Sequence, residues 1–263
     1  MPSLKSVPAI FPGSRSFHDW ARWHALLIPL HFCLMRSTTI LASLGMASLA
    51  VWGQPTAPSL PLEDSLCNRY ALLVETVGAA QDGMTTYLMH WTMPEEDRLS
   101  AMFGTDLHPL TLVAPEGVFN SPYNGSWSAS GMNPRFFEVM PTMKDDTYAT
   151  IGLQTGAKAS GLEGAEDPTM VQDPGEPWDV FFVEDGETHL NIATHTGGSW
   201  FVLRTASNGA PVDGKVFIAQ ITTKGSLSGA INAQFFPAIE GVNQAKCRCQ
   251  FEGAGVFQSI GID

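Results

Sequence analysis

Apolar and polar residues alternate with a period of two through most of the chain after residue 69. Successive side chains of a β-strand point to opposite faces, so this alternation is typical of strands with one buried face. The segments between the alternating runs are rich in Gly, Pro, Asn and Asp, which favour turns. The pattern predicts about eleven strands, over residues 70–77, 85–92, 99–103, 110–113, 148–154, 179–183, 188–193, 200–205, 215–223, 229–236 and 247–251.

Helical periodicity is nearly absent, and the one candidate is a short turn near residues 133–139. Parallel strands need long crossover connections, whereas antiparallel strands can be joined by short turns. We therefore expect an all-β fold, an antiparallel and jelly-roll-like β-sandwich or a flattened barrel, of about 10–12 strands. Apolar residues on both faces of 215–223 indicate a central strand. We expect the loops KGSLSG and EDGE to close hairpins between their flanking runs.

The N-terminal region differs from the rest of the chain. Residues 35–53 have the order of a secretory signal peptide, with an initiating Met, one Arg, an apolar run and small residues near the cleavage point. Residues 1–34 are then an upstream extension or a mis-called start. In the alternative, residues 23–52 form a membrane anchor. Arg36 and its polar neighbours divide that stretch into pieces shorter than the roughly 20 residues that span a bilayer.

Residues 54–66 predict a Pro-rich linker, and residues 67–263 predict a single β-sandwich domain with no membrane span after signal cleavage. The whole chain of 263 residues carries 14 basic and 26 acidic residues. Loss of residues 1–53 removes four basic residues and one acidic residue, which leaves a net charge near −15. Such a surface repels phosphate backbones, so we expect no nucleic-acid partner, and it attracts cations.

Three cysteines remain after signal removal. Cys67 precedes the first predicted strand, and Cys247 and Cys249 lie in the last one. A disulfide from Cys67 to either Cys247 or Cys249 would join the two ends of the domain, as suits an exported protein. The remaining thiol is either free or available for an intermolecular link.

Catalytic motifs do not mark an enzyme in this chain. No nucleophile elbow, HEXXH helix, Walker loop or dinucleotide-binding glycine motif is present. His189 and His195 are six residues apart, so on one strand they lie roughly 20 Å apart and cannot share a metal ion. His90 and His108 are isolated in the sequence. A hydrolase of convergent design remains an alternative if His90 or His108 meets a Ser or a carboxylate in a pocket.

Acidic loops offer candidate calcium ligands. Asp145 and Asp146 precede a strongly alternating run and are the preferred positions for a calcium ion, which takes oxygen ligands from flexible loops. No EF-hand pattern is present. Apart from this possible calcium, the sequence predicts no cofactor.

Loop aromatic residues are the candidate ligand-binding groups. Trp127 lies outside every predicted strand among small polar residues, and Tyr123 is close to it in the sequence. Rings presented by a polar loop often contact sugars or proteins. Alternatively, Trp127 folds back to close an open end of the sandwich.

The order of several segments resembles a β-rich, adhesin-like module that recurs in large secreted and surface proteins of marine bacteria. The segments are DRLSAMFG, TYATIGLQ, GGSWFVLR, VFIAQITTKG and SGAINAQFF. The resemblance covers residues 70–252. It implies an extracellular role in adhesion or surface display, often in tandem copies, and it assigns no catalytic residues. This chain departs from the pattern because it holds a single copy.

The sequence thus predicts a secreted or cell-surface β-sandwich module without enzymatic activity. Its expected partner is an extracellular glycan or a cell-surface protein, bound through loops at one end. A secreted hydrolase and a structural module of a larger surface protein are the alternatives.

Overall fold

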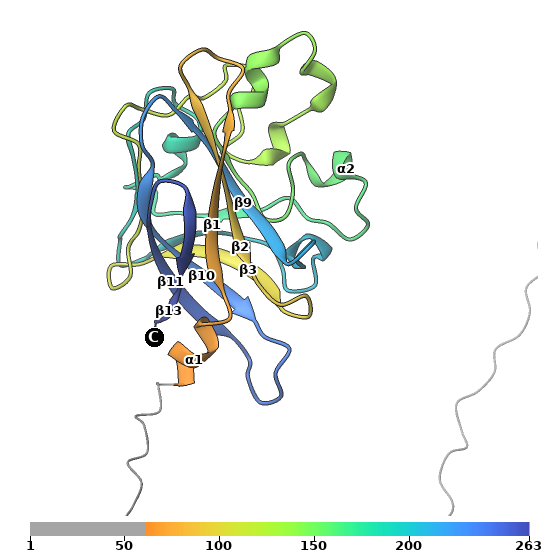
Figure 1. Cartoon of the computed structure of the whole chain (residues 1–263), viewed down its shortest axis with the longest axis vertical. Coiled ribbons are helices and arrows are strands. Elements are labelled where there is room, and N and C mark those ends of the chain that lie inside the picture. Colours follow the sequence, from red (N-terminus) through yellow and green to blue (C-terminus); the bar gives the residue numbers. More distant parts are fainter. Residues whose placement is uncertain (1–61, 263) are drawn as a thin grey trace, which may run out of the picture. The chain divides into compact units, whose positions relative to one another are not determined.

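A computed structural model describes residues 62–262 as two antiparallel β-sheets packed face to face (Figure 1). The fold is therefore the β-sandwich that the alternation predicts, and the strands separate into two sheets instead of closing one barrel. The predicted signal peptide and upstream extension, and the first part of the linker, lie outside the described residues. Residues 62–66 of the predicted linker belong to the short helix α1 (Leu62–Cys67), which is followed directly by the first strand.

The first sheet has five strands in the order β12-β1-β2-β9-β5. Their bounds are β1 (Ala71–Gly78), β2 (Thr85–Thr92), β5 (Tyr148–Ala149), β9 (Lys215–Thr223) and β12 (Gly255–Gln258). Strand β9 lies between β2 and β5, in the central position that its apolar faces predict.

The second sheet has eight strands, with the main order β13-β11-β10-β3-β8-β6. Its strands are β3 (Arg98–Gly104), β4 (Leu110–Val113), β6 (Thr169–Val171), β7 (His189–Ile192), β8 (Gly198–Phe201), β10 (Ser228–Phe236), β11 (Ala245–Glu252) and β13 (Ile260–Gly261). Strand β10 pairs with β4 along its first half and with β3 along its second half. Strand β7 extends the sheet beyond β4.

Helical segments are short and lie between strands. They are α2 (Ala157–Ser160) and the 3-10 helices η1 (Ala129–Gly131), η2 (Pro134–Phe136), η3 (Pro141–Asp145), η4 (Asp179–Phe182) and η5 (Ser207–Gly209). The strand predicted over 179–183 is wrong, because η4 occupies that position. Phe181 and Phe182 are both fully buried, which a strand with alternating faces does not allow and a helical turn does. The loop EDGE therefore closes no hairpin between strands.

The predicted hairpin at KGSLSG is also wrong. Strand β9 belongs to the five-stranded sheet and β10 to the eight-stranded sheet, so this connection passes from one layer to the other. Leu227, in the connection, is fully buried in the main core. Its burial directs the chain across the interior between the two sheets instead of back along the edge of β9.

A β-bulge in β9 changes which side chains face the core. The register with β2 shifts between Met89 and His90, which pair with Ala219 and Phe217, so Ile218 is the extra residue. Ile218 and Ala219 both join the main core, whereas Phe217 belongs to a separate apolar cluster. Simple alternation would place Phe217 and Ala219 on one face.

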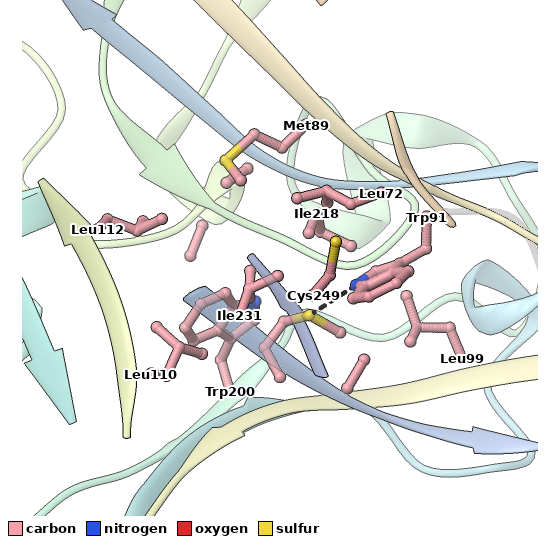
Figure 2. Close-up of a cluster of buried hydrophobic side chains, with 14 of the residues drawn as sticks. Leu72, Met89, Trp91, Leu99, Leu110, Leu112, Trp200, Ile218, Ile231 and Cys249 are labelled. Carbon is pink, nitrogen blue, oxygen red and sulfur yellow. Dashed lines mark hydrogen bonds between the residues drawn. The ribbon is translucent and has the colours of Figure 1, made fainter. Parts of the chain in front are cut away.

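The main core fills the space between the sheets (Figure 2). Trp91 from β2 and Trp200 from β8 are fully buried there, from opposite layers. Their ring N–H groups remain satisfied, because Trp91 donates to Met102 Sδ at 3.3 Å and Trp200 donates to the Thr150 carbonyl at 3.2 Å. Burial of such large side chains is the main favourable contribution to folding.

A second, smaller core covers the outer face of the five-stranded sheet. It contains Phe217 together with Tyr148, Met143, Met132 and Ala129. The rings of Phe217 and Tyr148 meet edge to face at 6.1 Å. This cluster fixes residues 129–148, which carry η1, η2 and η3, against β9.

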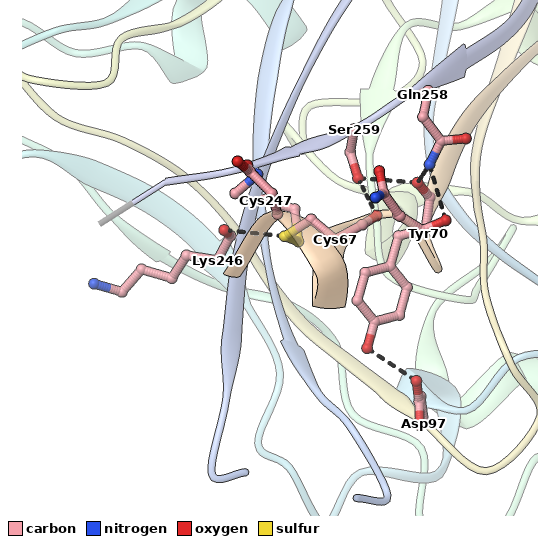
Figure 3. The surroundings of a disulfide bond; sticks show 10 residues. Cys67, Tyr70, Asp97, Lys246, Cys247, Gln258 and Ser259 are labelled. Carbon is pink, nitrogen blue, oxygen red and sulfur yellow. Dashed lines mark hydrogen bonds between the residues drawn. A yellow bond between two sulfur atoms is a disulfide. The ribbon is translucent and has the colours of Figure 1, made fainter. Parts of the chain in front are cut away.

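A disulfide joins the beginning of the domain to β11 (Figure 3). Of the two partners that the sequence left open for Cys67, the structure bonds Cys247, with the Cα atoms 5.6 Å apart. Cys249 is buried with a free thiol. Next to the disulfide, the Ser259 hydroxyl donates to the carbonyls of Cys67 and Tyr70, so the C-terminal strands are also tied to the start of β1.

Replacement of both Cys67 and Cys247 by Ala is expected to lower the free energy of unfolding by about 2–5 kcal/mol, because the bond closes a long loop in the unfolded chain. The two residues are 180 positions apart. Urea unfolding with and without reductant measures the loss. Cys249→Ala is the control: it keeps the disulfide, so reductant should still destabilise it. An unfolding midpoint insensitive to reductant in the parent protein would contradict the bond.

Candidate functional site

The candidate site is a groove of about 960 Å³ beside the second core. Five segments supply its walls: the loop before η1, η1 itself, η2, η3 and the region around α2. The lining residues are Tyr123, Ser130, Gly131, Met132, Asn133, Pro134, Arg135, Phe136, Met143, Gly156, Lys158, Ala159 and Asp167. Because the second core holds η1 to η3 on β9, the groove is built on a packed base.

Two aromatic rings of the groove are open to solvent. Tyr123 is 53 % exposed and Phe136 is 49 % exposed. Phe136 lies in η2, whose N-cap is Asn133, with Asn133 Oδ1 accepting a hydrogen bond from the Arg135 amide at 3.2 Å. The predicted binding residue Tyr123 is therefore at a concave surface, together with a second ring that sequence analysis missed.

The structure gives Trp127 a different environment from Tyr123. Trp127 is partly buried against the main core, and its ring meets Trp178 edge to face at 5.5 Å. Its carbonyl accepts a hydrogen bond from the Ala149 amide at 3.1 Å. Trp127 does not line the groove, so it supports the loop that carries Tyr123, in line with the alternative in which it folds back on the sandwich.

Hydrogen bonds fix the loop between Tyr123 and η1. The Ser130 hydroxyl, at the groove wall, lies 2.9 Å from both the Ser126 and the Ser128 hydroxyls. Asn124 Oδ1 accepts from the Ser126 amide at 3.0 Å. A Cβ atom at Gly131 would overlap this Asn124 oxygen. The loop therefore has a defined conformation before any ligand arrives, which reduces the entropy lost on binding.

Asp145, a predicted calcium ligand, is buried and accepts two backbone hydrogen bonds. Its carboxylate oxygens accept from the amides of Ala80 and Gln81 at 2.8 and 2.9 Å, so it holds the β1–β2 turn. The neighbouring Gln220 side chain donates to the carbonyls of Lys144 and Asp146 at 2.7 Å each. These contacts anchor the end of η3 to the sheet.

Asp146 is buried as well and holds the loop before η1. Its oxygens accept from the Ser121 amide and from Asn124 Nδ2, both at 2.6 Å. Burial raises the pKa of Asp146 from 3.8 to about 7, although both hydrogen bonds act in the opposite direction.

The calcium site stays a prediction without support from the geometry, because the oxygens of Asp145 and Asp146 face N–H donors. Among the residues that the structure describes, no three His, Cys, Asp or Glu side chains gather as metal ligands. The tie between neighbouring loops that calcium was expected to provide is made by hydrogen bonds.

Two basic side chains border the groove. Arg135 and Lys158 are exposed, and neither lies within 4.0 Å of a carboxylate in residues 62–262. Asp167 also lines the groove, with Oδ1 accepting a hydrogen bond from the Ala157 amide at 2.7 Å. The lining thus combines exposed rings, unpaired cations, a carboxylate and neutral hydrogen-bonding groups.

The four histidines are dispersed. His195 lies 3.0 Å from Asp106, but its side chain is 97 % exposed, and His189 contacts only the neighbouring Thr188 hydroxyl. His108 uses its backbone to accept a hydrogen bond from the Asn232 side chain.

His90 is the one histidine with a surrounding that suits the hydrolase alternative. It lines a smaller pocket with Lys215 and Ser207, and its Nδ1 lies 3.6 Å from Glu75 Oε2, beyond hydrogen-bonding distance. Burial lowers the pKa of His90. The Ser207 hydroxyl donates to the Glu163 carbonyl at 2.7 Å. The hydrolase therefore stays a prediction.

Comparison of the chain with protein-family models, with curated proteins and with solved structures finds no match. The resemblance to an adhesin-like module stays a prediction. No described helix has the length and apolar character needed to cross a membrane.

Replacement of Asp146 by Asn is expected to change the pH dependence of stability. A carboxyl group with a raised folded pKa contributes stability below its unfolded pKa near 3.8, and this contribution is lost as the pH rises towards 7. Each unit of pKa shift corresponds to about 1.4 kcal/mol. Urea unfolding between pH 4 and 8 should therefore show the parent protein losing stability relative to the variant. Parallel curves would contradict the assignment.

Proposed function

We propose that the chain is a secreted, non-enzymatic β-sandwich module that binds a glycan in the groove beside Tyr123. The observation that carries the proposal is the pairing of two half-exposed rings, Tyr123 and Phe136, on the walls of one groove. A sugar ring has apolar C–H faces and polar hydroxyl edges. Aromatic rings suit the faces, and fixed amide and hydroxyl groups suit the edges.

The size and lining of the groove favour a glycan over a protein surface. Its volume of about 960 Å³ is within the range of sites that enclose small ligands or short chain segments. Protein interfaces of standard size bury about 800 Å² on each partner around a dry apolar centre. Here Asn133, Ser130, Arg135 and Asp167 share the surface with the rings, so polar groups reach the centre of the site.

A binding role without hydrolysis also follows from the carboxyl groups. Glycoside hydrolysis generally uses a pair of carboxyl groups on either side of the bond that is cleaved. Among the described residues that line the groove, Asp167 is the only acidic one, and it already accepts a backbone hydrogen bond. The groove therefore suits recognition of a sugar and lacks a carboxylate pair for its cleavage.

Two further observations support the extracellular part of the proposal. The Cys67–Cys247 disulfide suits an oxidising compartment. The sequence also has the order of a secretory signal in residues 35–53.

Replacement of Tyr123 or Phe136 by Ala is expected to weaken glycan binding about tenfold or more, since loss of a central aromatic contact costs about 1.4 kcal/mol or more. The melting temperature should change little, because both rings are half exposed. Affinity electrophoresis through gels containing xylan, galactan, mannan or β-glucan measures binding. The control is Leu107→Ala, which removes an equally exposed apolar side chain from the β3–β4 turn.

Trp127→Ala separates support of the loop from contact with the glycan. We expect it to lower the melting temperature, because it removes a partly buried ring that packs on Trp178. Retardation of the Tyr123→Ala and Phe136→Ala proteins equal to that of the parent, in every gel that retards the parent, would overturn the proposal.

A further inference from the structure

The outer face of the eight-stranded sheet carries a second group of unpaired cations. In β11, Cys247 and Cys249 point into the core, so Lys246 and Arg248 point outward. Figure 3 shows the Lys246 side chain directed away from the disulfide, with its ammonium group free. Arg98 of β3 is paired in register with Phe236 of β10. We call Arg98, Arg204, Lys246 and Arg248 the basic face.

Strand register shows which side chains lie between these cations. One row across the sheet runs from Lys246 through Gln234 and Ala101 to Phe201. Residues opposite one another in a sheet share a face, so this row is on the outer surface. Small Ala101 lies between a polar and an aromatic side chain, which gives the face a shallow floor.

The next row begins at Arg248 and passes through Asn232 and Phe103 to Ser199. Arg248 donates to Asn232 Oδ1 at 2.7 Å and to the Pro109 carbonyl at 2.6 Å, so its position is fixed. Phe103 is partly exposed. Neither of the two rows contains an acidic residue.

The Arg204 guanidinium lies 4.9 Å from the centre of the Phe236 ring, at the same edge as Arg98. Phe236 and Phe201 are partly exposed, as Phe103 is. The basic face therefore combines cations with rings that are open to solvent, and such rings can pack against sugar faces.

Charge is the main argument that the basic face has a ligand. The chain from residue 54 onward has a net charge near −15 and ten basic residues, four of which are on this face. No carboxylate in residues 62–262 lies within 4.0 Å of any of the four. The Debye length is about 8 Å at physiological ionic strength, so acidic groups elsewhere on the molecule scarcely weaken the local positive field.

The spacing fits a chain with repeated negative charges. Lys246 and Arg248 are two residues apart, about 7 Å along the strand, and Phe201 lies three strands from Lys246, roughly 14 Å across the sheet. A flat surface of this extent suits an extended polymer.

We propose that the basic face binds an extended anionic polysaccharide, with sulfate or carboxylate groups at the cations and sugar rings on the phenylalanines. A nucleic acid is the less favoured polyanion, because tight binding typically neutralises 6–10 phosphates and this face offers four cations. The site is separate from the Tyr123 groove, and its existence does not depend on that groove binding a glycan.

The test compares dextran sulfate with neutral dextran of the same length, and adds polygalacturonate and single-stranded DNA as further probes. Binding of the full domain is measured by biolayer interferometry at 50 and 300 mM NaCl. We expect dextran sulfate or polygalacturonate to bind, with affinity falling as salt rises, and dextran not to bind. The stronger of the two anionic polymers identifies the charged group.

The variant Lys246→Gln with Arg204→Gln should lower affinity for the anionic polymer at least tenfold. Both side chains lie on the surface without a hydrogen bond to lose, so stability should be unchanged. Lys224→Gln is the matched control: it removes an exposed, unpaired cation before β10, at the opposite end of that strand from Gln234. Tyr123→Ala should leave binding to the anionic polymer unchanged.

Three results would overturn the proposal. They are equal binding of dextran and dextran sulfate, an equal loss of affinity in Lys224→Gln, and tighter binding of DNA than of either anionic polysaccharide. Loss of anionic-polymer binding in Tyr123→Ala alone would instead assign it to the groove, and this too would reject the basic face.

Discussion

Burial of strand β9 on both faces is the constraint on which the rest of the structure depends. Its inner face closes the sandwich core, and its outer face is covered by residues 129–148. The bulge at Ile218 makes this possible, because it turns Phe217 outward while its neighbours remain inside. Phe217 supplies the apolar contact and Gln220 supplies two hydrogen bonds to the covering segment. Without this cover, the groove would have no wall.

The alternation of side chains was sufficient to predict the sandwich, but not the details that build the site. A bulge adds one residue without any change in composition, so the outward position of Phe217 has no signal in a period-two pattern. The adjacent buried rings of Phe181 and Phe182 resemble part of a strand and form a 3-10 turn. Alternation also places Cys247 and Cys249 on one face, so it could not select the partner of Cys67.

The groove shows a similar division. Tyr123 was predicted from its polar loop, whereas Phe136, Arg135 and Lys158 were missed because they come from short helical segments without a period. Their approach to Tyr123 depends on contacts distant in sequence, in particular those of Asp146 with Ser121 and Asn124. The Pro134 and Asn133 pair was the one available signal, since it marks the start of η2. The proposed groove and basic face would together let one small domain hold a polysaccharide at two places, which raises the effective affinity for a surface.

The central claim is that a glycan occupies the groove formed by the covering segment of β9. Amide chemical shifts of the isotope-labelled domain, titrated with an oligosaccharide of the polymer that retards it most, test this claim directly. The account predicts that the largest shifts fall on Tyr123, Asn133 to Phe136, and Lys158. Shifts concentrated around His90 and Ser207, or cleavage of the oligosaccharide during the titration, would contradict it.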